Sequence, residues 1–139
     1  MPSDTYRYFT TGAFQFGVSM REFYIASIAE AGLHVESLAW VTHFHSFPEH
    51  ELGNGSIVDL GRPWMEGSMH HHFLVSWPYS IDRRAAICAT PSGDVTYLWL
   101  IPIAESEARF ARQNGVEALE DLLEKNEVDP ADPYRKAVV

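Results

Sequence analysis

The chain has 139 residues, of which 46% are hydrophobic and 13% aromatic, and its formal net charge is -9. This composition excludes an intrinsically disordered chain, and the length predicts a single domain, residues 1–139, around one hydrophobic core. The negative charge repels a phosphate backbone. It therefore argues against sequence-independent nucleic-acid binding and favours a basic protein partner.

The cysteine content and the N-terminus indicate the cellular compartment. Cys88 is the only cysteine, so it cannot form an internal disulfide, and this fits a reducing cytoplasm. Residues 1–8 lack the basic region and apolar run of an export signal, and no stretch reaches about 18 uninterrupted apolar residues. We expect a cytoplasmic protein that does not span a membrane.

The first third of the chain predicts two strands and a helix. Aromatic and β-branched residues in Tyr6–Gly12 predict a first strand. Arg21–Ile28 predicts a second strand, although a helix is the alternative there. Leu33–Phe47 predicts a helix that ends at Pro48. The core-facing stripe of this helix is expected to consist of Leu33, Trp40, Val41, Phe44 and Phe47.

Two strands and a hairpin are predicted next. Ile57–Leu60 predicts a short strand, and His70–Trp77 alternates between two faces until Pro78. Ala85–Thr90 is followed by the turn residues Pro91–Asp94 and then by another strand. This arrangement is the clearest hairpin in the chain.

The stretch from Val95 to Phe110 organises the predicted fold. Its first residues place apolar side chains on both faces of a strand, which indicates a central strand buried on both sides. Pro102 has no amide hydrogen, so regular pairing should end there. A helix with small alanines on its inner side should then run from about Ala104 to Asn114.

A second amphipathic helix is predicted from Val116 to Leu123, with acidic residues on its outer side. Strands interrupted by one helix and followed by two more predict an α+β fold. We expect a mixed, mainly antiparallel β-sheet with one middle helix and two C-terminal helices packed on it.

Several stretches together resemble suppressor-of-fused-like domains, most clearly from Gly53 to the C-terminus. They are Val58-Asp59-Leu60-Gly61-Arg62-Pro63-Trp64, Gly67-Ser68, Phe73-Leu74-Val75-Ser76 with Pro78-Tyr79, the run from Leu98 to Glu107, Gly115-Val116-Glu117-Ala118-Leu119, and Asp132-Pro133 with Arg135 and Val138-Val139. The resemblance implies a binding domain without established catalysis. It further implies a small bacterial-type member, and such members act as immunity proteins against toxins.

Two features depart from the family pattern. The animal namesake clasps a peptide between two domains, whereas this chain has room for one domain only. The family usually has Ser or Thr where this chain has Ala104. Without that hydroxyl, a capping box with Glu107 loses one half, at a cost of about 1 kcal/mol, and Ser106 is the alternative cap.

Partner-binding residues are predicted in two groups. Arg62 and Trp64 are of types enriched at binding hot spots, although Trp64 could equally fill the edge of the sheet. Tyr79 is a third anchor, and Arg83 either contacts the partner or belongs to a solvated turn. The acidic group either steers a basic partner or is an ordinary soluble surface; it consists of Glu117, Glu120, Asp121 and Glu124.

The histidines raise the alternative of a metal site. His43, His45 and His50 lie near one predicted helix end, and His70 and His72 share a strand face. However, the first two diverge on a helix and no His-Glu-x-x-His spacing occurs, which favours exposed, structural histidines. Cys88 is expected to be a buried thiol. No cofactor motif is present in the sequence, and we expect no cofactor.

The leading hypothesis is a non-enzymatic immunity-type protein that binds and neutralises a basic toxin domain. The first alternative is a small metal-dependent hydrolase that uses the clustered histidines. The second alternative is a domain that self-associates through an exposed sheet edge.

Overall fold

The computed structural model describes residues 5–15, 20–78 and 86–139. The described residues form a mixed sheet in which β2 and β6 are parallel and the other strand pairs are antiparallel. Its order is β1-β2-β6-β4-β3, and β5 pairs with the first part of β6. The strands are β1 (Tyr6–Phe9), β2 (Arg21–Ser27), β3 (Ile57–Asp59), β4 (His70–Ser76), β5 (Ile87–Thr90) and β6 (Gly93–Ala104).

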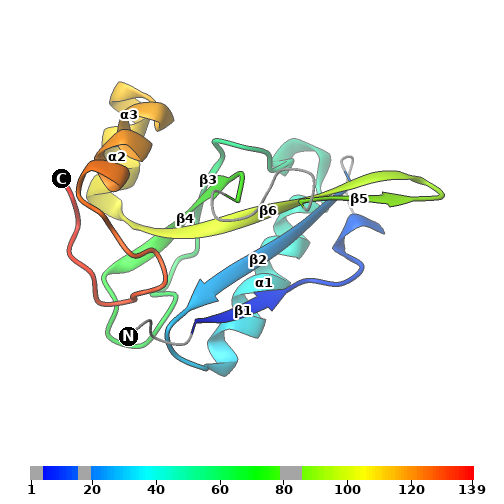
Figure 1. Cartoon of the computed structure of the whole chain (residues 1–139), viewed down its shortest axis with the longest axis horizontal. Coiled ribbons are helices and arrows are strands. Elements are labelled where there is room, and N and C mark those ends of the chain that lie inside the picture. Colours follow the sequence, from blue (N-terminus) through cyan, green and yellow to red (C-terminus); the bar gives the residue numbers. More distant parts are fainter. Residues whose placement is uncertain (1–4, 16–19, 79–85) are drawn as a thin grey trace.

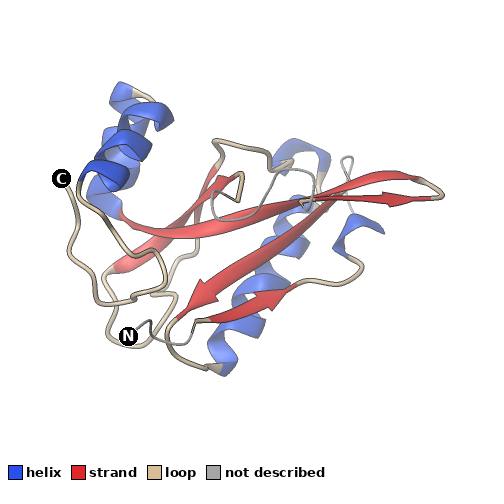
Figure 2. Ribbon diagram, in the orientation of Figure 1, coloured by secondary structure: helices blue, strands red, loops and turns tan. Residues whose placement is uncertain are grey.

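Helices pack on both faces of this sheet. In Figures 1 and 2, α1 lies behind the strands, and α2 and α3 lie at the end of β6. One face packs against α1 (Gly32–His45), and the other packs against α2 (Glu105–Asn114) and α3 (Val116–Lys125). Two short 3₁₀ turns, η1 (Ala13–Gln15) and η2 (Pro48–His50), complete the described elements. The predicted α+β class, the hairpin and the two closing helices are confirmed, and the strand interpretation of residues 21–27 is correct.

Strand β6 is central, as its sequence predicts. Leu98 and Leu100 pack on the α1 side, whereas Trp99, Ile101 and Ile103 pack on the side of α2 and α3. All five are buried, with at most 9% exposure. Because side chains on both faces of β6 enter a core, burial of this strand contributes to the packing of both helical layers.

Pro102 does not end the strand, and that prediction was wrong. β6 continues to Ala104, with Pro102 opposite Phe73 of β4. The Pro102 carbonyl accepts a hydrogen bond from Arg135, so it points away from β4. Since N–H and C=O of one strand residue point to the same edge, the missing amide hydrogen costs no bond to β4.

The buried face of α1 differs from the predicted stripe. Trp40 is 37% exposed and Phe47 is 43% exposed. Val41 is buried as predicted and Phe44 packs against the core, but the other buried positions are His34, Ser37, Leu38 and His45. Polar residues can be buried on this face because each has a hydrogen-bond partner. For example, His34 Nε2 lies 3.2 Å from the Ala29 carbonyl, and His45 Nδ1 accepts from the Leu52 amide at 2.9 Å.

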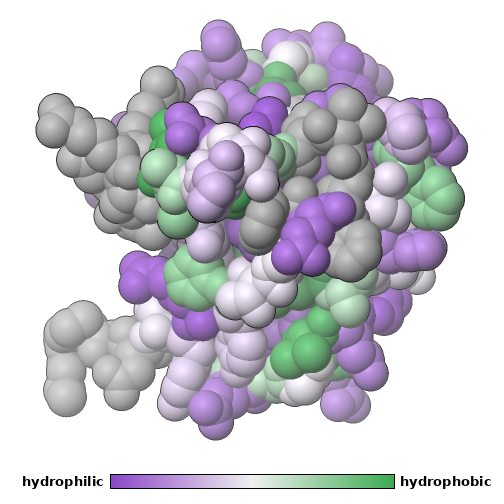
Figure 3. All heavy atoms as spheres, turned by 90° about the vertical axis from the view of Figure 1, so that its right-hand side faces the viewer, coloured by the Kyte–Doolittle hydropathy of each residue, from purple (hydrophilic) through white to green (hydrophobic). Residues whose placement is uncertain are grey.

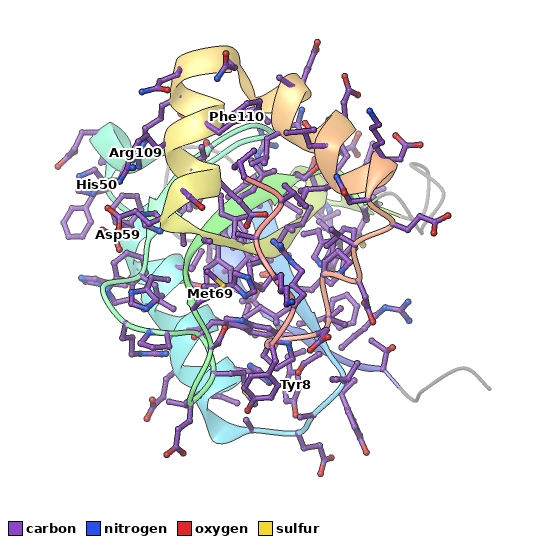
Figure 4. All side chains as sticks on the ribbon, turned by 90° about the vertical axis from the view of Figure 1, so that its left-hand side faces the viewer. Tyr8, His50, Asp59, Met69, Arg109 and Phe110 are labelled. Atoms are coloured by element: carbon purple, nitrogen blue, oxygen red, sulfur yellow. The ribbon has the colours of Figure 1, made fainter. Side chains whose placement is uncertain are left out.

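A buried ion pair joins the C-terminal segment to the start of α2. The Arg135 guanidinium donates to both carboxylate oxygens of Glu107 at 2.9 Å, and it also donates to the Pro102 carbonyl at 3.0 Å. The backbone amides of Ala104 and Val138 donate to the same carboxylate at 2.8 and 3.1 Å. Figure 4 shows the segment after α3 passing below α2, the helix that carries Arg109 and Phe110.

The same contacts correct the predicted helix cap. Glu107 keeps its half of the capping box through the Ala104 amide, although Ala104 has no hydroxyl to return the bond. Ser106 is not the substitute cap, because its hydroxyl donates to the Val139 carbonyl at 2.8 Å. Both residues therefore hold the C-terminal segment, and Glu107 also caps the helix start.

The protonation of this buried cluster depends on its hydrogen bonds. Burial raises the pKa of Glu107, but the hydrogen bonds from Arg135, Ala104 and Val138 outweigh burial and place the pKa below its usual range. His70, fully buried beside this pair, has a pKa lowered to about 4 by burial and by the charge of Arg135, with Glu107 and Asp132 opposing. Burial also lowers the pKa of His34 and His72.

We expect Arg135→Met to lower the free energy of unfolding by about 3–5 kcal/mol, because it leaves the Glu107 charge buried without its counter-ion. The matched control is Arg109→Met, which breaks the exposed Arg109–Glu105 pair and should cost less than about 1 kcal/mol. Urea unfolding of both variants measures the difference. A loss below about 1 kcal/mol for Arg135→Met would contradict the assigned role.

We expect the free energy of unfolding to fall as the pH is lowered from 7 to 5. A histidine whose folded pKa lies below its unfolded value of about 6.5 binds the proton only in the unfolded chain between those two values, so acid favours unfolding there. For His70 that window runs from about 6.5 down to about 4. The lowered pKa of Glu107 adds a further loss below a pH of about 4.5.

Urea unfolding at a series of pH values tests this assignment. Within the window, His70→Asn should reduce the slope of the free energy of unfolding against pH by about 1.4 kcal/mol per pH unit. This reduction corresponds to the uptake of close to one proton on unfolding. His71→Asn, at an exposed position of the same strand, is the control. If both variants keep the wild-type slope, His70 is not the titrating group.

Candidate protein-binding groove

A groove of about 890 Å³ lies between α3 and the sheet. One wall is the acidic face of α3, to which Leu123 also contributes, and the floor includes Ser76, Trp99 and Ile101 of the sheet. Trp77, Pro78, Val128 and Pro130 extend the apolar lining, and Asn54 adds a polar group. The groove therefore combines an apolar base with one charged side, which is a combination found in binding sites for charged polypeptides.

The charged wall contains the four carboxylates that the sequence singled out. These residues are one face of two helical turns, because their spacing is i, i+3, i+4 and i+7. The opposite face of α3 is anchored in the core by Leu119 and Leu123. All four line the groove: Glu117, Glu120, Asp121 and Glu124.

This wall carries uncompensated negative charge. Within the described part of the chain, no hydrogen bond or ion pair reaches these carboxylates. Burial and the neighbouring charge of Asp121 raise the pKa of Glu120. Like charges three and four residues apart repel each other by about 0.2–0.5 kcal/mol per pair, so α3 keeps a destabilising arrangement that a cationic partner would relieve.

One row of residues across four strands ends in the groove floor, which Trp99 and Ser76 line. Phe9 of β1 lies opposite Tyr24 of β2, Tyr24 opposite Trp99 of β6, and Trp99 opposite Ser76 of β4. The rings of Phe9 and Tyr24 stack with centroids 5.1 Å apart, and those of Tyr24 and Trp99 stack at 6.1 Å. Burial raises the pKa of Tyr24 to about 12, so its hydroxyl stays neutral. This ladder fixes the indole at the base of the groove.

The predicted anchors Arg62 and Trp64 lie elsewhere. Trp64 has no exposed surface and stacks on His34 of α1 at 5.1 Å, which fits the scaffold alternative. Arg62 donates to the Ser37 hydroxyl at 3.1 Å and to the Pro63 carbonyl at 2.9 Å, so it ties this loop to α1. Tyr79 and Arg83 lie outside the described residues.

Sequence reasoning missed the floor of the groove. The alternation pattern assigns Ser76, Trp77 and Trp99 to faces of their strands. It does not tell which part of a face packs under a helix and which part borders a groove. The alternation of β4 and β6 does place Ser76 and Trp99 correctly. What no local pattern contains is that a groove lies between α3 and these residues.

The histidines are dispersed and largely buried. His34, His45, His70 and His72 are at most 6% exposed, so the prediction of exposed strand histidines was wrong for two of them. His50 lies at the edge of the molecule (Figure 4). In the described ranges, which contain every histidine and the cysteine, no group of three His, Cys, Asp or Glu side chains is arranged to hold a metal ion.

The end of the molecule that carries the β5–β6 hairpin is a weaker candidate surface. Figure 3 shows its hydrophobic side chains in separate groups between hydrophilic ones. Cys88 lies on β5 and is exposed, so the predicted buried thiol was wrong. Its neighbour Ile87 is 42% exposed. Both residues show that this hairpin is exposed.

None of the helices in the described ranges is long and apolar enough to cross a membrane.

Comparisons with known proteins agree with the sequence resemblance. The chain is 32% identical over 74 residues to "Immunity protein YqcF" of Bacillus subtilis (strain 168), a match that spans 53% of this chain and 38% of that protein. The structure is similar to a putative SUFU homologue from Neisseria gonorrhoeae FA 1090, with a TM-score of 0.85, 30% identity, and coverage of 100% of this chain and 75% of that one.

Two further solved structures share the fold at low identity. Drosophila Suppressor of Fused matches 88% of this chain and 33% of its own at 12% identity, with a TM-score of 0.69. A chain of the Sufu–Fu complex matches 90% of this chain and 58% of its own at 13% identity, with a TM-score of 0.58. The family model "Suppressor of fused protein (SUFU)" matches residues 22–136, which is most of the sequence. This chain therefore belongs to the suppressor of fused family.

Proposed function

We propose that this protein is a cytoplasmic, non-enzymatic immunity-type protein that binds and neutralises a basic toxin domain, and that the groove beside α3 contacts the toxin. The main support for this proposal is the groove. Its wall has four carboxylates without an ion-pair partner among the described residues, and its floor is apolar. The relative named as an immunity protein supports the class of function. The Sufu–Fu complex supports a protein partner for this fold.

The charge of the chain suits this task. A net charge of -9 attracts a basic domain over about one Debye length, roughly 8–10 Å at physiological salt, and raises the association rate. The groove then adds short-range contacts that the overall field cannot give. Carboxylates on one face of a rigid helix select lysine and arginine side chains at matching positions, so the charge also provides specificity.

The structure gives the hydrolase alternative no geometric support, because the described histidines do not converge with other ligands. The four buried histidines lie on both sides of the sheet and pack in the two cores. Hydrogen bonds to neighbouring groups account for His34, His45 and His70, and His72 Nε2 lies 3.8 Å from the Asp59 carboxylate. The groove is the better basis for a function.

The proposal predicts a strong loss of binding when the wall is neutralised. The variant Glu117→Gln, Glu120→Gln, Asp121→Asn and Glu124→Gln should bind an inactivated toxin domain from the neighbouring reading frame at least about tenfold more weakly, mainly through slower association. Surface plasmon resonance at low and high salt measures both rate constants.

The matched control removes the same number of charges outside the groove. It carries Glu36→Gln, Glu49→Gln, Glu51→Gln and Glu66→Gln, all at exposed positions. This control should lose only the part of the association rate that comes from the overall negative charge. Equal losses for the two variants would reject the groove as the contact surface, and salt-independent wild-type binding would reject a basic partner.

A further inference from the structure

The floor of the groove contains a buried hydroxyl without a partner. Ser76 is 1% exposed, yet it lines the groove, and its Oγ makes no hydrogen bond within the described residues. Its side chain points to the groove side of the sheet because it lies directly opposite Trp99 in the β4–β6 ladder. A buried hydroxyl that lacks a hydrogen bond is costly, so its occurrence at the base of a binding groove is informative.

The surroundings of this hydroxyl define what could satisfy it. Trp99 and Ile101, which are 9% and 2% exposed, are apolar lining residues of the same groove, and Glu120 supplies a half-buried carboxylate in its wall. An occupant must therefore have an apolar stem, a positive end group and several hydrogen-bond donors. A hydrophobic side chain would leave both the hydroxyl and the carboxylate unpaired.

We propose that this floor is a socket for one arginine side chain of the bound protein, with the guanidinium donating to Ser76 Oγ and to Glu120 while its stem lies on Trp99 and Ile101. The inference rests on the proposed function, since it names the side chain that the groove selects in its partner.

Arginine fits this socket better than lysine for a geometric reason. Its planar end group carries five N–H donors in a fixed fork, so it can serve a hydroxyl and a carboxylate at once. The plane can also stack on an indole, and Trp99 is held in place by its own stacking on Tyr24. Lysine has a compact, strongly hydrated ammonium group that would lose more solvation in the same place.

Three short peptides test the socket without the toxin. The probes are acetyl-Gly-Gly-Arg-Gly-Gly-amide and the same peptide with lysine or citrulline at the centre. The readout is the indole N–H signals in the NMR spectrum of the full chain. Trp77 and Trp99 line the groove, whereas Trp64 is buried in the other core and Trp40 lies on α1, so the last two are internal controls.

The arginine peptide should shift the Trp99 signal in a saturable way and leave the Trp64 signal unchanged. The lysine peptide should bind severalfold more weakly, and the uncharged citrulline peptide should not bind measurably. Equal binding of the arginine and lysine peptides would overturn the assignment of arginine. No saturable shift with any peptide would overturn the socket.

Substitutions at Ser76 provide a second test. Ser76→Ala should raise the dissociation constant of the arginine peptide by about two- to tenfold, which corresponds to the loss of one hydrogen bond. Ser76→Thr keeps the hydroxyl and should restore binding. The control is Ser27→Ala, which changes a fully buried strand serine that bonds the Ala29 amide.

Folding does not confound this comparison. Ser76→Ala removes an unsatisfied buried group, so we expect its thermal stability to be unchanged or higher. Unchanged peptide binding in a folded Ser76→Ala variant would overturn the role of the hydroxyl. If the toxin binds through the acidic wall but the arginine peptide does not, the socket fails while the proposed function stands; if neither binds, both fail.

Discussion

The bidentate contact between Arg135 and Glu107 is the interaction on which the groove side of the molecule depends. It joins three separate parts of the chain: the end of β6 through Pro102, the first turn of α2, and the C-terminal segment. The segment between α3 and Arg135 includes Val128 and Pro130, which line the groove. A buried, bidentate pair has few alternative arrangements, so it fixes how this segment passes the sheet.

The acidic wall illustrates a cost that the fold carries for binding. Placing four carboxylates on two turns of α3 weakens the helix by mutual repulsion, and none of them is compensated within the described chain. Leu119 and Leu123 offset this cost by packing in the core. The contrast with Glu107 is instructive, since that carboxylate is buried and fully paired. Charge that holds the fold is internal here, and charge available to a partner is at the groove.

Particular residues show where sequence patterns were sufficient and where they failed. Alternation along β6 correctly placed Leu98 and Trp99 on opposite faces, and helical spacing correctly grouped the acidic residues of α3. The stripe predicted for α1 was right for Val41 but wrong for Trp40 and Phe47, because these aromatic residues were assumed to be internal. Burial of His34 and His45 depends on backbone partners that are brought near by the tertiary fold, so periodicity cannot reveal it.

The sequence by itself determined the elements, the central strand, the family and the negative charge, because these depend on local periodicity, composition and short motifs. Only the tertiary structure decided that Trp64 is internal, that Arg135 reaches back to Glu107, and that Ser76 lies below the acidic face of α3. The physical reason is that a groove is a place where packing is incomplete. Local patterns specify which side chains can be buried, whereas the arrangement of whole layers decides which of them stay uncovered.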